Sequence, residues 1–380
     1  MSTPTDATPI QMVDLKRQYK KIKREVDAAI RQSLDSTMFI GGQQVTSFQK
    51  NLESYLQVKH VIPCANGTDA LQIAFMALGL QPDDEVIVPA FTYVATAEVI
   101  ALLHLKPIMV DVDARTFNIT AKTIEKAISP KTKAIVPVHL FGQSCDMEDI
   151  LAVAKKHNLF VIEDNAQAIG SDYTFQNGDK RKTGTLGDIG CTSFFPSKNL
   201  GAYGDGGALM TNDDTLAARI RMIANHGQSR RYYHDEVGVN SRLDAIQAGI
   251  LDVKLRQLDK YCTARQRAAR VYDRAFKDID GLDIPKRQRN STHVFHQYTL
   301  RVKGGHRTAL QAHLQTLGIP SMIYYPVPLY KQQAFAHYWD KKELKTTETL
   351  CEEVLSLPMH TELDATTLQR ITEGVLSFFK

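Results

Sequence analysis

The chain has 380 residues, of which 43% are hydrophobic and 23% charged, and its formal net charge is only +4. This composition is ordinary for a globular protein, and because Lys and Arg are dispersed we expect no nucleic-acid partner. No stretch approaches the roughly 18 consecutive apolar residues of a membrane span, and because residues 1–10 are polar, with no apolar core of signal-peptide length, we expect no signal peptide. We therefore expect a cytoplasmic protein with no membrane partner.

Predicted strands and helices alternate between about residues 60 and 212. The strands are expected at 60–65, 85–89, 108–112, 134–140 and 160–164, and the helices at 69–78, 96–105, 121–128 and 147–157. Continuous apolar strands separated by helices indicate an α/β fold with a mostly parallel central sheet buried on both faces.

The C-terminal part predicts a smaller α/β domain. Residues 240–277 have a continuous helical pattern and are predicted to form one linking helix. Strands near 297–302 and 321–324 and helices near 307–317 and 366–379 would build this domain. We predict an N-terminal arm and helix over 1–35, a large domain over 36–260 and a small domain over 261–380. The first ten residues are predicted to be a mobile tail.

The five cysteines are scattered and form no CxxC pair and no zinc-type array with histidine. We expect free thiols and no bound metal. The pair His293 and His296 is interpreted as structural rather than metal-binding.

The segment from Ser193 to Lys198 runs into a glycine-rich loop over 201–207. Glycines let the backbone approach a ligand closely. An amine delivered to a confined pocket is a candidate Schiff-base nucleophile, because partial burial lowers the pKa of lysine toward the working pH. A single lysine is seldom catalytic, so this interpretation of Lys198 depends on two further motifs.

The first of these motifs is a carboxylate, Asp164, at the end of the apolar strand 160–164. A semi-buried carboxylate is costly unless it is paired, and a protonated pyridine nitrogen is a suitable partner. The alternatives are a metal ligand or a helix cap. No second carboxylate or histidine stands at metal-ligand spacing, which disfavours the metal.

The second motif is Asn66-Gly67-Thr68-Asp69, a strand end followed by a helix start. Free amides and the helix dipole make such a start an anion site, although a simple N-cap gives the same pattern. Tyr93 follows the next strand and is suited either to stacking on a flat ring or to core packing. Ligands of parallel sheets lie at the carboxyl ends of the strands, so one site is predicted, with pyridoxal phosphate (PLP) chemistry.

The motifs in combination resemble those of the fold-type I, PLP-dependent nucleotide-sugar aminotransferases, the DegT/DnrJ/StrS group. The resemblance runs from about Met12 to the C-terminus and is carried, in this order, by CANGTDAL, VPAFTYVAT, EDNAQAIG, SFFPSKNLGAYGDGGA, GVNSRLDAIQA, YYPVPLY and SLPMH. Because Lys198 is present, the chain differs from the sugar dehydratase branch, which has histidine there.

The resemblance implies a role for each matching residue. Lys198 would form the Schiff base with PLP and then act as the base in the proton shift, and Asp164 would pair with the pyridine nitrogen. Gln167 would approach the ring hydroxyl and Tyr93 would stack on the ring. The phosphate would be held by Gly67, Thr68 and Ser193, and by Asn240 of the neighbouring subunit in a homodimer with shared active sites.

Within the family, the chain looks closest to the UDP-2-acetamido-2-deoxy-3-oxo-glucuronate 3-aminotransferases, which serve bacterial surface polysaccharides such as O-antigen. L-glutamate would be the amino donor. Arg242 would bind the uronate carboxylate as a bidentate fork, with Arg230 and Arg231 as weaker candidates for anion contacts.

The substrate pocket departs from the family pattern at two tyrosines. Tyr324 replaces a frequent histidine beside Tyr325, and Tyr330 replaces a frequent histidine or asparagine. Both departures are expected near the sugar, so a dTDP-3-keto-6-deoxyhexose is the alternative substrate. A PLP-binding regulatory protein without turnover is a more remote alternative.

Overall fold

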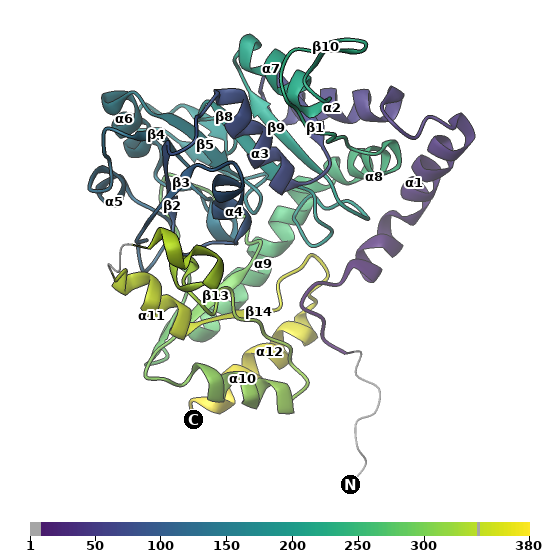
Figure 1. The fold of residues 1–380 in the computed structure, drawn as a ribbon. Helices are drawn as coiled ribbons and strands as arrows, with labels where there is room; N and C mark the ends of the chain where they lie inside the picture. Colours follow the sequence, from purple (N-terminus) through teal and green to yellow (C-terminus); the bar gives the residue numbers. More distant parts are fainter. Residues whose placement is uncertain (1–8, 340–342) are drawn as a thin grey trace.

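The computed structural model describes residues 9–339 and 343–380 (Figure 1). The tail predicted for the first ten residues therefore lies, up to residue 8, outside the described residues. The division into regions 1–35, 36–260 and 261–380 stays a prediction.

A seven-stranded sheet in the order β1-β9-β8-β5-β4-β2-β3 forms the centre of the molecule. Its strands are β1 (His60–Cys64), β2 (Glu85–Pro89), β3 (Lys106–Val110), β4 (Thr132–Ile135), β5 (Phe160–Asp164), β8 (Ile189–Ser193) and β9 (Gly207–Thr211). Neighbouring strands from β8 to β3 are parallel, and β9 is antiparallel to β8 and β1. The predicted α/β fold with a mostly parallel sheet is confirmed.

Both faces of this sheet are buried, as the apolar strands predict. Val86 and Val88 belong to the apolar cluster under α3 (Gly67–Leu78), α4 (Ala95–Leu102) and α7 (Asp214–Ala224). Ile87, between them, belongs to the cluster under α5 (Ala121–Glu125) and α6 (Met147–His157). Alternate residues of a strand point to opposite faces, so helices cover the sheet on both sides.

The predicted strand 134–140 is shorter than expected. It leaves the sheet after Ile135, and Val138 then bridges to Asp164 before the short 3₁₀ turn η1 (Leu140–Gly142). Strand 108–112 is shifted two residues toward the N-terminus. The loop after β4 is thereby brought to the carboxyl end of β5.

The prediction of a single helix over 240–277 is wrong. The chain forms α8 (Ala245–Leu255) and α9 (Leu258–Phe276), separated at Arg256 and Gln257. α8 packs against α1 (Leu15–Ser36) and α2 (Gly42–Leu56), whereas α9 packs against α12 (Ala365–Phe378). Because the two apolar faces have different partners, the chain changes direction between them, which a continuous helical pattern does not reveal.

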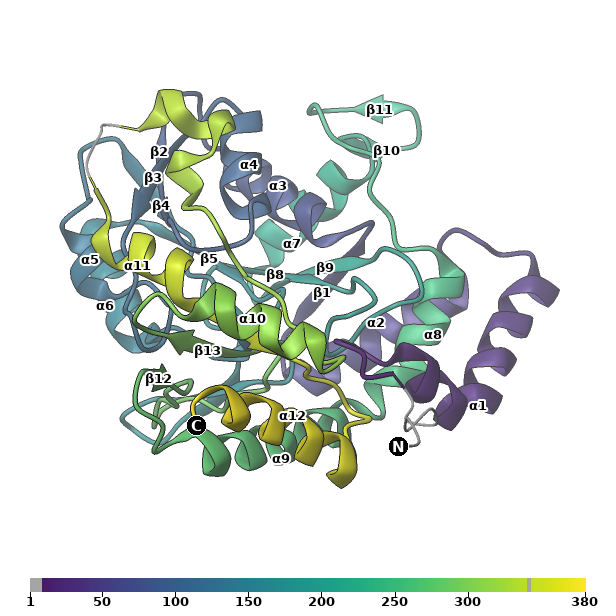
Figure 2. The same cartoon turned by 90° about the horizontal axis from the view of Figure 1, so that it is seen from below.

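A small antiparallel sheet lies below the central one, between α9 and α10 (Arg307–Thr316) (Figures 1 and 2). It contains β12 (Leu282–Asp283), β13 (Tyr298–Val302) and β14 (Val354–Leu357) in that order. The prediction of a strand at 321–324 is wrong. β14, which follows α11 (Lys345–Glu353), takes the place beside β13, and only Met322 makes an isolated bridge, to Ser356.

Two hairpins and two 3₁₀ segments complete the described structure. The hairpins are β6 (Asp172–Thr174) with β7 (Lys180–Lys182), and β10 (Gln228–Arg230) with β11 (Tyr233–His234); the 3₁₀ segments are η2 (Leu329–Lys331) and η3 (Gln333–Tyr338). The β10–β11 hairpin projects from the body of the molecule (Figures 1 and 2). No helix within the described ranges is long and apolar enough to cross a membrane.

Candidate active site

A pocket of about 710 Å³ lies where the carboxyl ends of β5 and β8 meet the first turn of α3. It brings together most of the site residues that the sequence predicts: Gly67, Thr68, Tyr93, Asp164, Gln167, Ser193, Lys198, Tyr324 and Tyr325. The parallel arrangement explains this convergence, since strands of one direction place their carboxyl ends on one edge of the sheet.

One end of the pocket is the N-terminus of α3. Of the amides in its first turn, that of Asp69 donates to the side chain of Asn66 at 2.8 Å, which leaves those of Gly67 and Thr68 facing the pocket. A Cβ on Gly67 would lie 2.7 Å from the Cβ of Ser193, so only glycine fits there. Ser193 is thereby held against the free amides, and this end of the pocket favours an anion.

Asp164 lies in the pocket wall with only 7% of its surface exposed. One carboxylate oxygen accepts a 2.8 Å hydrogen bond from the hydroxyl of Thr96, and the other accepts a 3.2 Å bond from the amide of Ala166. Both hydrogen bonds fix the orientation of the carboxylate. Asp164 is therefore a fixed, desolvated acceptor for a cationic group inside the pocket.

Lys198 follows a tight turn in which its amide donates to the carbonyl of Phe195 at 2.8 Å. The pocket leaves the side chain partly accessible, but the surrounding protein desolvates the ammonium. This desolvation lowers the pKa of Lys198 to about 8, against an opposing effect of the negative charge of Asp164. At pH 7 about a tenth of an amine with this pKa is neutral, far more than of an ordinary lysine, and the neutral form is the one that acts as a nucleophile or base.

Aromatic and amide side chains form the remaining wall. The ring of Tyr93 is 57% exposed and lies 6.3 Å from that of Tyr325. Gln167 accepts from the amide of Phe141 at 2.7 Å and donates to the hydroxyl of Tyr325 at 3.2 Å. A flat ligand between these groups would meet an aromatic face and a fixed amide.

The predicted residues Asn240 and Arg242 are not in this pocket. Both are exposed and flank Ser241, whose buried hydroxyl donates to Asp69 at 2.7 Å. Arg230 and Arg231 are exposed on the projecting β10–β11 segment, where their guanidinium groups lie over the rings of neighbouring tyrosines. Among the described residues that line the pocket, Lys198 is the one lysine or arginine.

The structure also corrects and extends the sequence prediction. Tyr330, expected near the sugar, is buried away from the pocket and donates to Glu348 at 2.5 Å. His296, interpreted as structural, lines the pocket, and burial together with the charges of Lys198 and Arg265 lowers its pKa well below the usual value. Gln297 and Gln332 also line it, and no sequence motif pointed to them.

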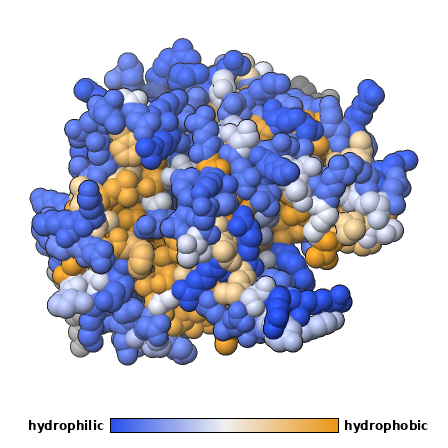
Figure 3. All heavy atoms as spheres, turned by 90° about the horizontal axis from the view of Figure 1, so that it is seen from above, coloured by the Kyte–Doolittle hydropathy of each residue, from blue (hydrophilic) through white to orange (hydrophobic). Residues whose placement is uncertain are grey.

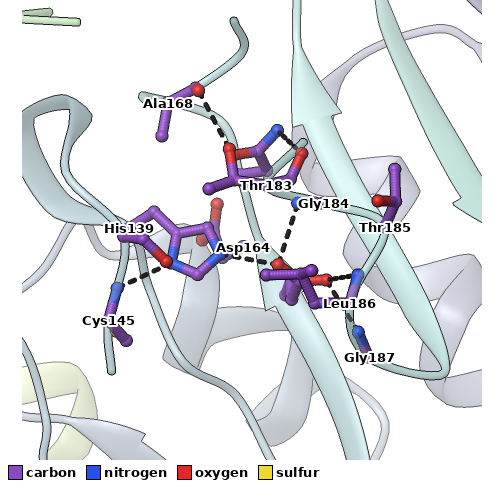
Figure 4. Close-up of polar contacts among 12 residues, drawn as sticks. His139, Cys145, Asp164, Ala168, Thr183, Gly184, Thr185, Leu186 and Gly187 are labelled. Atoms are coloured by element: carbon purple, nitrogen blue, oxygen red, sulfur yellow. Dashed lines mark hydrogen bonds and ion pairs between the residues drawn. The ribbon is translucent and has the colours of Figure 1, made fainter. Parts of the chain in front are cut away.

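A buried polar network supports the pocket from behind. His139, beside the end of β5, and the turn 183–187 donate hydrogen bonds to the carboxylate of Glu163. Figure 4 shows His139 and the residues of this turn on opposite sides of the network. Asn165 donates to the carbonyl of Thr183 at 3.0 Å, so the same turn is held from both sides of Asp164. Asp164 therefore faces the pocket, while its neighbours Glu163 and Asn165 hold the turn behind it.

These features fit pyridoxal phosphate. The free amides beside Ser193 suit its phosphate, the desolvated Asp164 suits a protonated pyridine nitrogen, and the amine of Lys198 suits its aldehyde. A mostly parallel sheet that carries such a lysine and carboxylate at its carboxyl edge defines the fold-type I class of PLP-dependent enzymes.

The chain belongs to the DegT/DnrJ/EryC1/StrS aminotransferase family, whose profile matches residues 20–376. It is 47% identical over 362 residues to a UDP-2-acetamido-2-deoxy-3-oxo-D-glucuronate aminotransferase of Pseudomonas aeruginosa, covering 95% of this chain and 98% of that protein. It is 44% identical over 367 residues to a UDP-N-acetyl-3-dehydro-α-D-glucosamine 3-aminotransferase of Acidithiobacillus ferrooxidans, covering 97% of each. A protein of Geobacillus stearothermophilus named as a pleiotropic regulatory protein is 46% identical over 374 residues, covering 98% of this chain and 99% of that one.

Solved structures give the same assignment. The structure of DesV of S. venezuelae in complex with a ketimine intermediate superimposes with a TM-score of 0.94 at 34% identity, covering 98% of this chain and 99% of that one. That of NtdA of Bacillus subtilis with the bound cofactor PMP superimposes with a TM-score of 0.91 at 28% identity, covering all of this chain and 87% of that one. The chain is therefore a PLP-dependent aminotransferase.

Proposed function

We propose that this enzyme moves an amino group from L-glutamate to C3 of a UDP-linked 2-acetamido-2-deoxy-3-oxo-glucuronic acid, in the biosynthesis of a bacterial surface polysaccharide. The observation that carries the activity is the convergence of Lys198, Asp164 and the α3 amides on one pocket. The 47% identity to a relative named for this substrate supports the sugar.

Bound PLP supplies an electron sink that stores the amino group between the two half-reactions. In our proposal Asp164 keeps the ring nitrogen protonated, Gln167 contacts the ring hydroxyl, and Tyr93 covers one ring face. Gly67, Thr68 and Ser193 hold the phosphate. The Nζ of Lys198 would hold the aldehyde end of the cofactor and would also be the base that moves the proton at the α carbon of the donor. Its lowered pKa suits this role as a base.

The substrate proposal needs a second cation, because the cofactor phosphate and a uronate carboxylate are both anionic. Lys198 is the one lysine or arginine among the described lining residues, and it is committed to the cofactor. We infer that Arg242, assisted by Arg230 and Arg231, supplies this charge from a second copy of the chain, and that Asn240 of that copy reaches the phosphate. Tyr324 and Tyr325 would then contact the sugar in a cytoplasmic homodimer with shared active sites.

Absorbance spectroscopy of the purified protein with PLP tests the activity and the substrate together. We expect a visible band that L-glutamate bleaches and that the UDP-3-oxo-uronate restores. Lys198→Ala should lack the band and show no turnover, because no other lining residue that the structure describes offers an amine. Undiminished turnover in that variant would contradict the mechanism.

Arg242→Ala separates the proposed substrate from the alternative one. If Arg242 binds a carboxylate, its loss should lower kcat/KM for the uronate about a hundredfold. The value for a dTDP-3-keto-6-deoxyhexose should be nearly unaffected. Equal loss on both sugars would refute the role of Arg242. If only the deoxysugar restores the band, the proposed uronate substrate is wrong and the assignment as an aminotransferase still holds.

A regulatory role is the other candidate, because one relative at 46% identity is named as a regulatory protein. A protein that only binds PLP would not require a lysine with a lowered pKa facing a fixed carboxylate. Bleaching of the band by glutamate without restoration by any keto-sugar would favour this role.

A further inference from the structure

We propose that Glu163 and His139 are positioning residues of this active site. They do not line the pocket, but they hold Asp164 where its carboxylate meets the cofactor. The inference rests on the proposed function, because it takes Asp164 as the partner of the ring nitrogen.

The carboxylate of Glu163 is completely surrounded by hydrogen-bond donors. One oxygen accepts from the imidazole Nε2 of His139 at 2.7 Å and from the amide of Gly184 at 2.8 Å. The other accepts from the amides of Leu186 at 2.6 Å and Gly187 at 2.8 Å. Neither Glu163 nor His139 has any exposed surface. The carboxylate therefore fixes two separate segments of the chain at the end of β5.

The hydrogen bonds also fix the protonation of His139. Its Nδ1 lies 3.1 Å from the amide nitrogen of Cys145, which can only donate, so Nδ1 must accept. The ring proton is then on Nε2 and points at Glu163. His139 is neutral, and Glu163 is a buried anion stabilised by hydrogen bonds rather than by a cation. A carboxylate in this setting is costly, and its complete coordination makes the surrounding geometry rigid.

This geometry is transmitted directly to Asp164. The amide of His139 donates to the carbonyl of Asp164 at 3.1 Å, and the amide of Asp164 donates to the carbonyl of Pro137 at 2.9 Å. Figure 4 shows His139 beside Asp164 at the end of the strand. The side chain of Glu163 thus holds His139, and the backbone of His139 holds Asp164.

The turn 183–187 has no room to adjust if the carboxylate changes. A Cβ on Gly187 would lie 2.6 Å from the carbonyl oxygen of Val161, and a Cβ on Gly190 would lie 1.9 Å from that of Gly184. In Glu163→Gln, the new NH₂ group would face two of the four donors, whichever way the amide turned. We expect the turn and His139 to move apart and Asp164 to move with them.

Variants of both residues test the proposal, with PLP affinity and the pH midpoint of the PLP absorbance band as readouts. Glu163→Gln and His139→Leu should weaken PLP binding about tenfold, as the loss of outer-shell partners does at preorganised sites, and should shift the midpoint. His139→Gln places an amide NH₂ where Nε2 lies, so it should keep both values near those of the parent. The control is Glu85→Gln, another buried carboxylate, at the far end of β2, where Ser129 donates to it. It should lower the melting temperature and leave both readouts unchanged.

The inference is overturned if folded Glu163→Gln keeps the parental midpoint and binds PLP within about twofold of the parent. It is also overturned if His139→Gln loses as much PLP affinity as His139→Leu. If Glu163→Gln does not fold, the two His139 variants decide. Asp164→Asn separates the two proposals. If it leaves the midpoint unchanged, the proposed role of Asp164 fails; if it shifts the midpoint and Glu163→Gln does not, only the present inference fails.

Discussion

At the scale of single residues, the chemistry of the site depends on the opposing effects of burial and charge on Lys198. Desolvation favours the neutral amine, whereas the carboxylate of Asp164 favours the ammonium. Burial has the larger effect, so the pKa is lowered to about 8 instead of being raised. The amine of Lys198 is therefore available although the carboxylate of Asp164 acts on it.

This balance predicts how the apoprotein captures PLP as the pH changes. Only the neutral amine attacks the aldehyde, so the rate of capture should rise with pH through a midpoint near 8, followed as growth of the visible band. Asp164→Asn removes the charge that opposes burial and should move this midpoint to lower pH. A parental midpoint near the ordinary lysine value would contradict the desolvation of Lys198.

At the scale of elements, the α3 N-terminus is an anion site only because β8 approaches it so closely. Gly67→Ala would place a methyl group against the Cβ and backbone of Ser193. We expect at least a tenfold loss of PLP affinity, measured by titration of the apoprotein, because the free amides and Ser193 are pushed apart. Gly178→Ala, at a turn glycine with open space around it, is the control and should bind PLP normally. Unchanged affinity in Gly67→Ala would place the phosphate elsewhere.

α8 contains a second buried amine, and it predicts a pH-dependent stability. Lys254 donates to the carbonyl of Gly201, and burial, with the charge of Arg265, lowers its pKa from 10.5 to about 7. Between these values the unfolded chain holds a proton that the folded chain has lost, so the free energy of unfolding should rise with pH. The rise is at most about 1.4 kcal/mol per pH unit. Denaturant titrations between pH 7 and 9 should show a steeper rise in the parent than in Lys254→Met, which keeps the contribution of Lys198; equal slopes would contradict it.

The elements also show which parts of the structure the sequence can predict. β2, β5 and α6 were predicted with their observed bounds, because their patterns are strong and local. The break between α8 and α9 and the choice of β14 over 321–324 depend on which distant element each segment meets. The same holds for the site. Motifs at the strand ends predicted Lys198 and Asp164 in the pocket, but not that Asn240 and Arg242 would lie outside it or that His296 and Gln332 would enter it through tertiary packing.

At the scale of the whole molecule, the chain exposes several large hydrophobic side chains, some of them beside the pocket. Large hydrophobic side chains are exposed at Met38, Phe39 and Ile40, and at Tyr93 and Phe195 beside the pocket. Figure 3 shows hydrophobic side chains gathered in the middle of one face, with hydrophilic ones around them. Such apolar surface is typical of a face that another chain covers. The exposed Asn240 and Arg242 are the residues that we propose such a second copy contributes.

Shared sites can be tested by mixing two inactive variants. Lys198→Ala lacks the amine in both sites of its dimer, and Arg242→Ala lacks the substrate cation in both. If each site takes Lys198 from one chain and Arg242 from the other, a mixed dimer contains one site with both residues intact. Half of the dimers in an equal, fully exchanged mixture are mixed, so about a quarter of all sites should regain activity. Activity toward the uronate, measured after dissociation and reassociation, should therefore rise well above that of either variant. If Arg242 instead serves its own chain, every site retains one defect and mixing recovers nothing, although an affinity tag on one variant pulls down the other and so shows that the chains have exchanged.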